Sequence, residues 1–394
     1  MKKYLFTLVA TTLCYTLHAQ PKANYWHTMA DGMAQALIEE FWGANFAGYP
    51  ERYYFNYESN MANMGTDHYW PQAHAMDVLV DAYMRTGDKQ YKKLFPLWWE
   101  GAPKHNFARK MNPKDPWWNV FVDDMEWIAL AQIRMFEATG NKLYINKARQ
   151  MYDEWIWPTW GPEDEAPWYG GITWKTDVEK TKNACSNGPA ALLAARLCRF
   201  YKQANLRGGK SQNAYLNEAI KIYTWEKNNL FDRNTGAVYD HMNRQGEVKR
   251  DWIFTYNIGT FLGAAHELYL LTGDKQYLDD AVLAASYVTD RMTRHGGVLS
   301  DATQGDGGLF HGIFFRYFVK LVNEETLDMA TRTKFHKWLT RAATIMAKEG
   351  VNPRTMLYAG SWHHAPADDE PVGLTPHLTG CMLMEAMCVL KPLE

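Results

Sequence analysis

A short motif recurs at wide intervals along this chain. The sequence TGDKQY occupies residues 86–91 and again 272–277, TGNKLY occupies 139–144, and a blurred copy runs through 208–215. In the clearer copies, a glycine that can end a helix precedes an aspartate or asparagine that can cap the next one. The motif is typical of a tight turn between two helices, and its recurrence predicts a chain built from repeated helical hairpins.

The residues after each turn follow helical periodicity. Tyr144, Ala148 and Met151 lie at positions i, i+4 and i+7 and therefore share one face of a helix. The tyrosines of the four copies are separated by 53, 71 and 62 residues, an average of 62. Six such units fill the chain after residue 19, and six hairpins can close into an (α/α)6 barrel. We predict an all-α, single-domain (α/α)6 barrel over residues 20–394, with an open solenoid of hairpins as the alternative.

The connections between the expected helices alternate in length. Residues 43–68, 99–119, 158–186, 230–253 and 294–308 form long loops rich in Gly, Pro, Asn, Asp and Trp, whereas the turns of the repeated motif are short. In a closed barrel the long loops gather at one end, and we expect function there because loops carry most binding and catalytic residues. The twelve expected helices lie near residues 26–42, 69–86, 89–98, 120–139, 142–157, 187–204, 212–229, 254–272, 275–293, 309–322, 325–348 and 374–390.

The first 19 residues have the pattern of a signal peptide. Lys2 and Lys3 precede an apolar run, and a polar segment follows that ends at Ala19. We predict cleavage near Ala19 and export to the periplasm, the cell surface or the medium. Beyond residue 20, no apolar run approaches the roughly 18–20 residues that span a bilayer, so no membrane span is expected there.

Charge and cysteine usage exclude several classes of partner and cofactor. The chain has 42 Lys and Arg against 44 Asp and Glu, without the basic surplus that nucleic-acid binding requires.

Cys381 and Cys388 are seven residues apart in an expected helix, about 10 Å, which exceeds the roughly 7 Å limit for a disulfide. Cys185 and Cys198 are further apart, so only a disulfide between members of the two pairs could form, and we expect free, buried thiols instead. No cysteine or histidine cluster suggests a metal, no cofactor is expected, and a monomer is the default expectation.

The chain is rich in tryptophan, with 17 residues of this type. Most must belong to a large core. Flat aromatic faces also stack on sugar rings, so some of these side chains could line a carbohydrate-binding groove.

Two adjacent carboxylates, Asp123 and Asp124, lie in the aromatic segment WWNVFVDDMEW at 117–127, where a helix is expected to begin. Cleavage of a glycosidic bond needs two carboxyl groups, one to protonate the leaving oxygen and one to attack the sugar or activate water. Carboxyls of neighbouring residues can stand about 5–5.5 Å apart, the separation of enzymes that retain anomeric configuration. Asp123 followed by Glu126 is also compatible with a capping box, a purely structural role.

Several sequence blocks around this pair resemble glycoside hydrolase family 76. They are the Asp-Asp segment at 117–127, GGITW at 170–174, KNACSNG at 182–188, TYNIG at 255–259 and DGGLFHGIF at 306–314. The blocks follow the family's order and cover essentially the whole chain after the signal peptide. The resemblance implies an (α/α)6 barrel that acts as an endo-α-1,6-mannanase with retention of configuration. Its substrate would be α-mannan or α-1,6-manno-oligosaccharides.

The resemblance also implies roles for individual residues. Asp123 matches the family's nucleophile and Asp124 its acid/base. Trp118 and Trp362 are additional candidates for sugar-stacking platforms. Residues that the family places around its groove, and that are therefore expected to bind substrate, are Trp70, Trp174, Asn183, Asn187, Tyr256, Asn257 and Asp306.

Two positions depart from the family's usual residues. Ile258 stands where glutamine is frequent and His311 where lysine is common, which affects expected subsite preference but not the aspartate pair. Three alternatives to a hydrolase of mannan remain open: a non-catalytic mannan-binding protein, a mannan transglycosidase, and an unsaturated glucuronyl hydrolase, whose acidic substrate would call for more basic loops.

Overall fold

The computed structural model describes residues 23–61, 69–112, 115–167, 169–176, 181–206, 209–294 and 296–393. The expected signal peptide over residues 1–19 lies outside these residues, as do parts of the loop at 43–68 and the beginning of the blurred repeat at 208–215.

Twelve α-helices, all expected from the sequence, account for most of the described chain, and strand content is small. Two short strands, β1 (Lys182–Asn183) and β2 (His241–Met242), pair antiparallel with Asn183 opposite His241. The helices are α1 (Ala23–Phe41), α2 (Tyr69–Thr86), α3 (Lys89–Gly101), α4 (Val122–Thr139), α5 (Lys142–Met151), α6 (Ala184–Ala204), α7 (Gln212–Asn229), α8 (Thr255–Thr272), α9 (Lys275–Tyr287), α10 (Phe310–Val322), α11 (Met329–Ile345) and α12 (Leu374–Val389).

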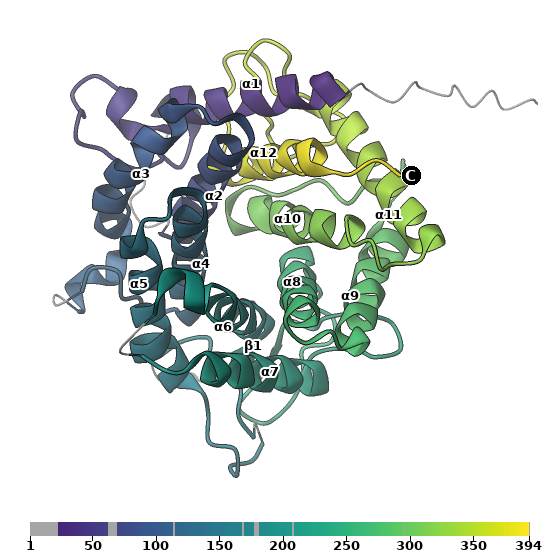
Figure 1. Ribbon diagram of the computed structural model, residues 1–394. Coiled ribbons are helices and arrows are strands. Elements are labelled where there is room, and N and C mark those ends of the chain that lie inside the picture. Colours follow the sequence, from purple (N-terminus) through teal and green to yellow (C-terminus); the bar gives the residue numbers. More distant parts are fainter. Residues whose placement is uncertain are drawn as a thin grey trace, which may run out of the picture.

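The helices form two concentric rings (Figure 1). The even-numbered helices make the inner ring, in which each contacts the next and α12 contacts α2, so the ring is closed. The odd-numbered helices surround it. Five outer helices follow their inner partner directly in the sequence, whereas α1 packs against α12. The expected (α/α)6 barrel is confirmed, with its sixth pair made by the first and last helices.

The repeated motif forms the expected turns. Gly87, Gly140 and Gly273 end α2, α4 and α8 with φ of 70°, 69° and 74°, a left-handed conformation that glycine adopts readily. The Asp88 side chain then accepts a hydrogen bond from the Gln90 backbone N–H at 2.9 Å and caps α3. Asn141 caps α5 in the same way. These turns join α2 to α3, α4 to α5 and α8 to α9.

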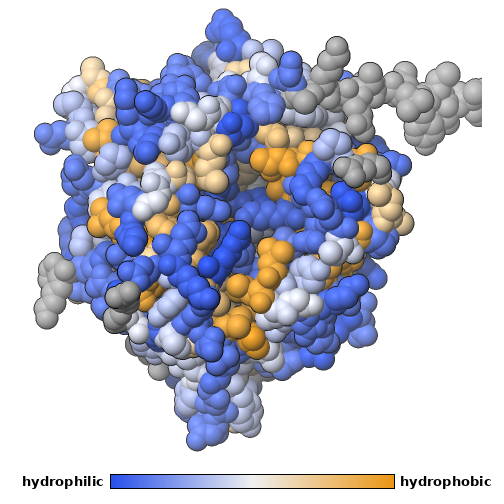
Figure 2. Space-filling view, viewed as in Figure 1, coloured by the Kyte–Doolittle hydropathy of each residue, from blue (hydrophilic) through white to orange (hydrophobic). Residues whose placement is uncertain are grey.

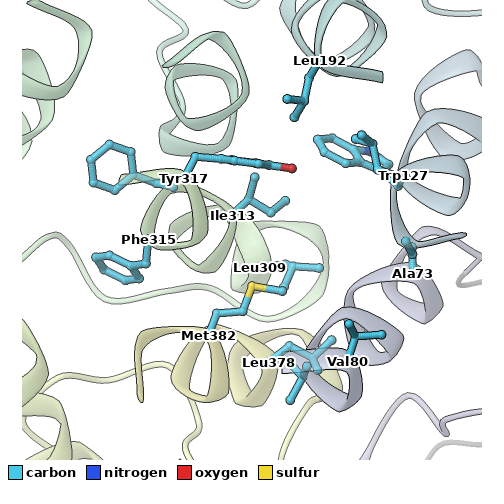
Figure 3. Packing of buried hydrophobic residues seen from close by; sticks show 14 of the residues in the cluster. Ala73, Val80, Trp127, Leu192, Leu309, Ile313, Phe315, Tyr317, Leu378 and Met382 are labelled. Atoms are coloured by element: carbon cyan, nitrogen blue, oxygen red, sulfur yellow. The ribbon is translucent and has the colours of Figure 1, made fainter. Parts of the chain in front are cut away.

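The inner helices are buried on nearly all sides, and small residues let them approach closely. A Cβ atom added at Gly259 on α8 would lie 2.7 Å from the Phe314 Cα atom of α10, and one at Gly312 would lie 2.9 Å from the Thr379 Cα atom of α12. Figure 3 shows side chains from α2, α4, α6, α10 and α12 converging, among them Val80 and Trp127. The core therefore occupies the barrel centre.

The outer surface is predominantly polar on the face shown in Figure 2, where apolar residues form small separate patches. Within the described ranges, no helix combines the length and apolar character needed to cross a bilayer. The four described cysteines, Cys185, Cys198, Cys381 and Cys388, are free thiols.

Candidate active site

The long loops and the first turns of five inner helices surround a cavity of about 630 Å³. Trp70, Asp123, Cys185 and Tyr256 are each the second residue of their inner helix, α2, α4, α6 and α8. The inner helices therefore point their N-terminal ends, which carry partial positive charge, at the cavity. The other lining residues are Tyr57, Phe107, Phe121, Asp124, Trp127, Trp174, Thr181, Asn183, Asp240, His241, Trp252, Phe254, Gly305, Asp306 and Phe310.

Asp123 and Asp124 lie in the first turn of α4 and are both partly exposed to the cavity. The Val122 backbone N–H donates to the Trp174 carbonyl at 2.9 Å, and this hydrogen bond connects the start of α4 to the loop before β1. The capping-box interpretation is wrong, because Phe121 holds the N-cap position without a side-chain cap. Both carboxyl oxygens of Glu126 are buried and have no hydrogen-bond partner among the described residues.

Asp123 has a strongly perturbed environment. The dense protein around it removes most solvating water and raises the pKa of its carboxyl to about 7. Hydrogen bonds from the Cys185 thiol, from the backbone N–H groups of residues 123 and 124 and from the Trp174 side chain oppose this rise in pKa. These donors favour the carboxylate form, the form that a nucleophile needs.

The environment of Asp124 favours its protonated form. Burial raises the pKa of its carboxyl well above the usual range, and the negative charges of Asp123 and Asp306 raise this pKa further. Its Oδ2 accepts a hydrogen bond of 3.1 Å from the Asn119 side-chain amide. Two adjacent carboxyls thus differ in environment, one suited to be ionised and the other to be protonated, which is the pattern of an acid/base pair.

Five of the residues expected to bind substrate line the cavity. They include Trp70, whose indole Nε1 donates to Asp306 Oδ1 at 2.9 Å. The ring of Tyr256 stacks on Phe310 with centroids 4.0 Å apart and an interplanar angle of 14°. Trp174 packs against Phe121. Asn183 completes the set, and its Oδ1 accepts a hydrogen bond from Thr181 at 2.7 Å.

Two expected asparagines lie behind the cavity wall. Asn187 is fully buried, and its side chain donates to the carbonyls of Ile172 and Asn183 and accepts from the Ile172 N–H. Asn257 is also fully buried and donates to Asp240 Oδ1 at 3.1 Å. Both brace residues near the cavity rather than face it.

Neither predicted stacking platform, Trp118 or Trp362, lines the cavity. Trp362 is 1% exposed, and its indole donates to the Ser300 carbonyl, so it is a core residue. The two family departures are also outside the lining. Ile258 is fully buried, and the His311 ring contacts Thr255 Oγ1 and the Ser300 carbonyl.

The sequence pattern did not single out several cavity residues. Asp240 and His241 come from the loop between α7 and α8, with His241 Nδ1 2.8 Å from Asp240 Oδ2. Phe107 and Trp252 are exposed aromatics of the lining, at 40% and 47%. These residues follow no helical period, and only the composition of the loops indicated them. In the part of the chain that the structure describes, no group of three or more His, Cys, Asp or Glu could hold a metal ion.

Comparison with known proteins gives a family and close structural relatives. Residues 25–393 match the model of glycosyl hydrolase family 76. An inactive variant of the α-1,6-mannanase GH76A of Salegentibacter sp. HEL1_6, in complex with α-1,6-mannotriose, is 34% identical with a TM-score of 0.80 and is aligned over 93% of this chain and 100% of that one. In that variant two consecutive aspartates are replaced by asparagines.

Two further relatives are more distant. The Lin0763 protein of Listeria innocua is 28% identical with a TM-score of 0.75, over 92% of this chain and 96% of that chain. Cellobiose 2-epimerase of Ruminococcus albus is 27% identical over 139 residues, which are 34% of each chain. The chain thus spans about a third of the length of this curated relative.

Proposed function

This chain belongs to glycosyl hydrolase family 76, and on that premise we propose that it is an endo-acting α-1,6-mannanase that retains anomeric configuration. One observation carries the proposal: two adjacent carboxyls, Asp123 and Asp124, lie together in the first turn of α4 at an aromatic-lined cavity. The complex of the Salegentibacter enzyme with α-1,6-mannotriose supports α-1,6-linked mannose chains as the substrate class.

The proposed reaction is a double displacement. The Asp123 carboxylate attacks the anomeric carbon while the glycosidic C–O bond breaks, and its electron pair goes to the leaving oxygen, which takes the proton of Asp124. In the second step, Asp124 accepts a proton from water, the water oxygen attacks the anomeric carbon, and the ester bond to Asp123 breaks. Donors on Cys185 and Trp174 favour the carboxylate form of Asp123, whereas the negative charges of Asp123 and Asp306 favour the protonated form of Asp124, and these causes support this division of roles.

The cavity lining supports a neutral polysaccharide as substrate. Trp174, Tyr256 and Trp252 offer aromatic faces for sugar rings, and Asn183 and Asp306 offer hydrogen-bonding groups. The exposed positions of Phe107 and Trp252 extend this aromatic surface toward solvent. Binding distributed over several rings suits cleavage within a chain rather than at its end.

The test is a time course on linear, debranched α-1,6-mannan, with NMR of the newly formed anomeric protons. We expect mixed oligosaccharides that appear first in the α configuration. Products in the β configuration would contradict retention, and mannose as the sole early product would contradict endo cleavage. Binding without turnover would favour a mannan-binding protein, and new, longer oligosaccharides at high substrate concentration would favour a transglycosidase.

We also propose that the protein is exported as a monomer after cleavage near Ala19. The sequence pattern of residues 1–19 supports export. Mass spectrometry of the protein recovered outside the cytoplasm, expected to begin at Gln20, tests the cleavage site, and light scattering tests the monomer.

A further inference from the structure

Asn119, in the loop before α4, is fully buried, and its side chain makes three hydrogen bonds. Its Oδ1 accepts from the Phe121 backbone N–H at 2.9 Å. Its Nδ2 donates to Asp124 Oδ2 at 3.1 Å and to Asn106 Oδ1 at 2.9 Å. Both N–H bonds of the amide and its oxygen are thus used, and one partner is the carboxyl of the proposed acid.

Backbone groups determine the orientation of this amide. A backbone N–H can only donate, so the atom of Asn119 that faces the Phe121 N–H must be the oxygen. The NH₂ group therefore points at Asp124. Asn106 is oriented in the same manner, because its Oδ1 accepts from the Ala108 N–H and its Nδ2 donates to the carbonyls of Pro116 and Trp118. Backbone groups of the loop between α3 and α4 thus determine which atoms donate and which accept in the hydrogen bonds that link Asn119 to Asn106 and Asp124.

We infer that Asn119 is a positioning residue that determines which oxygen of Asp124 carries the catalytic proton. The carbonyl oxygen of a protonated carboxyl is a better acceptor than its hydroxyl oxygen, so the Asn119 N–H favours Oδ2 as the oxygen without the proton. The proton then resides on Oδ1, the other oxygen of a residue that lines the cavity. This inference rests on the proposed function, because it assigns a role within that reaction.

One proton moves at Asp124 Oδ1 in each step of the reaction. In the first step, the O–H bond at Asp124 Oδ1 breaks and a new O–H bond forms on the leaving sugar oxygen, while Oδ2 still accepts from Asn119. In the second step, Oδ1 takes the proton of the attacking water and returns to its starting state. Asn119 keeps the same hydrogen bonds throughout, which spares the cost of reorienting a donor during the reaction.

The variant Asn119→Asp tests this role. It preserves shape and an acceptor for the Phe121 N–H, but it replaces the donor that faces Asp124 with an oxygen. Measuring two substrates separates an effect on the acid Asp124 from a general loss of activity. Debranched α-1,6-mannan has a leaving group that needs the proton of Asp124, whereas α-1,6-mannobiosyl fluoride has one that leaves without it. Single-turnover measurements isolate the first chemical step for both.

We expect the mannan rate to fall by about 10- to 100-fold, part of what a general acid contributes, and the fluoride rate to change less than about 3-fold. Equal losses on both substrates, or no loss on either, would overturn the inference. If the wild-type protein cleaves neither substrate, the proposed function fails and the inference fails with it, an outcome distinct from a failure in the variant alone.

A matched control exists in the loop between α11 and α12. Asn352 is also a buried loop asparagine, its Oδ1 accepts from backbone N–H groups, and its Nδ2 donates to the carboxyl of Asp368 at 2.9 Å. Asn352→Asp makes the same chemical change away from the cavity, and we expect both rates to stay within about 2-fold of wild type. If Asn119→Asp does not fold, Asn119→Ser, too short to reach Asp124, carries the same two-substrate expectation.

Discussion

The indole Nε1 of Trp70 donates a hydrogen bond of 2.9 Å to Asp306 Oδ1, joining residues 236 positions apart in the sequence. Trp70 comes from the first turn of α2 and Asp306 from the loop before α10, so the contact ties two sides of the cavity together. It also holds a negative charge near Asp124, whose pKa is raised in part by Asp306.

Replacing Asp306 by Asn should therefore shift the pH profile. Loss of its charge lowers the pKa of Asp124, and the acid loses its proton at lower pH, so the alkaline limb of kcat/KM on α-1,6-mannan should move to lower pH. Asp279→Asn, the same charge change on an exposed helical face, should leave the limb in place. An unchanged limb in Asp306→Asn would show that Asp306 does not influence the acid.

Asp123→Asn should abolish turnover and yet stabilise the fold at alkaline pH. The folded chain raises the pKa of Asp123 from 3.8 to about 7. Between these values the native state holds a proton that the unfolded chain has released, so this residue lowers stability as pH rises through the window. We expect a higher Tm for the variant than for wild type at pH 8 and a much smaller difference near pH 4, measured by calorimetry. A lower Tm at pH 8 contradicts the assigned direction.

Trp252→Ala should weaken substrate binding with little effect on the chemical step. This ring lines the cavity, is 47% exposed and touches neither aspartate in any contact described above. Loss of one stacking contact of about 0.5–1.5 kcal/mol corresponds to a KM on mannan about 2- to 13-fold higher. Tyr169→Ala, which removes an exposed ring outside the cavity lining, is the control. A large fall in kcat with unchanged KM would assign Trp252 a different role.

Gly259→Ala should destabilise the barrel by about 1–3 kcal/mol, because the new methyl group would meet the α10 backbone at Phe314. Gly32→Ala, on α1, is the matched control: the three atoms nearest its methyl group would all belong to the flexible Met356 side chain. There the higher helix propensity of alanine, about 1 kcal/mol, should offset the contact. Urea unfolding of both variants measures the difference, and equal effects would show that backbone proximity is not limiting.

Much of the fold was predictable because its signals are local. The TGD turns at 86–88 and 272–274 formed as expected, and the turn chemistry of Gly and Asp needs no distant partner. All twelve helices were expected, with ends that shifted by a few residues; α6, for example, begins at Ala184 rather than near 187. Periodicity over several turns identifies a helix, whereas its first residue depends on the contacts of the preceding loop.

The site was predictable only in part. Asn183 and Asn187 are one helical turn apart and belong to one sequence block, yet Asn183 lines the cavity and Asn187 braces Ile172 behind it. Asp240 gave no sequence signal, because it lies in an irregular loop and reaches the cavity through the pairing of β1 with β2. Which side chain faces a cavity depends on how loops from distant parts of the chain pack, and no local pattern encodes that.

By itself, the sequence determined the twelve helices, the short turns between them and the adjacent Asp123 and Asp124, because periodicity, turn chemistry and adjacency are properties of neighbouring residues. Only the tertiary structure decided how the two carboxyls differ. Burial in the closed ring raises the pKa of both carboxyls, and donors on Cys185 and Trp174 favour the charged form of Asp123. The charge of Asp306 raises the pKa of Asp124 further, and Asn119 donates a hydrogen bond to this carboxyl. The pKa of a carboxyl depends on every charge and donor within a few ångströms, and here Trp174, Cys185 and Asp306 come from distant parts of the sequence.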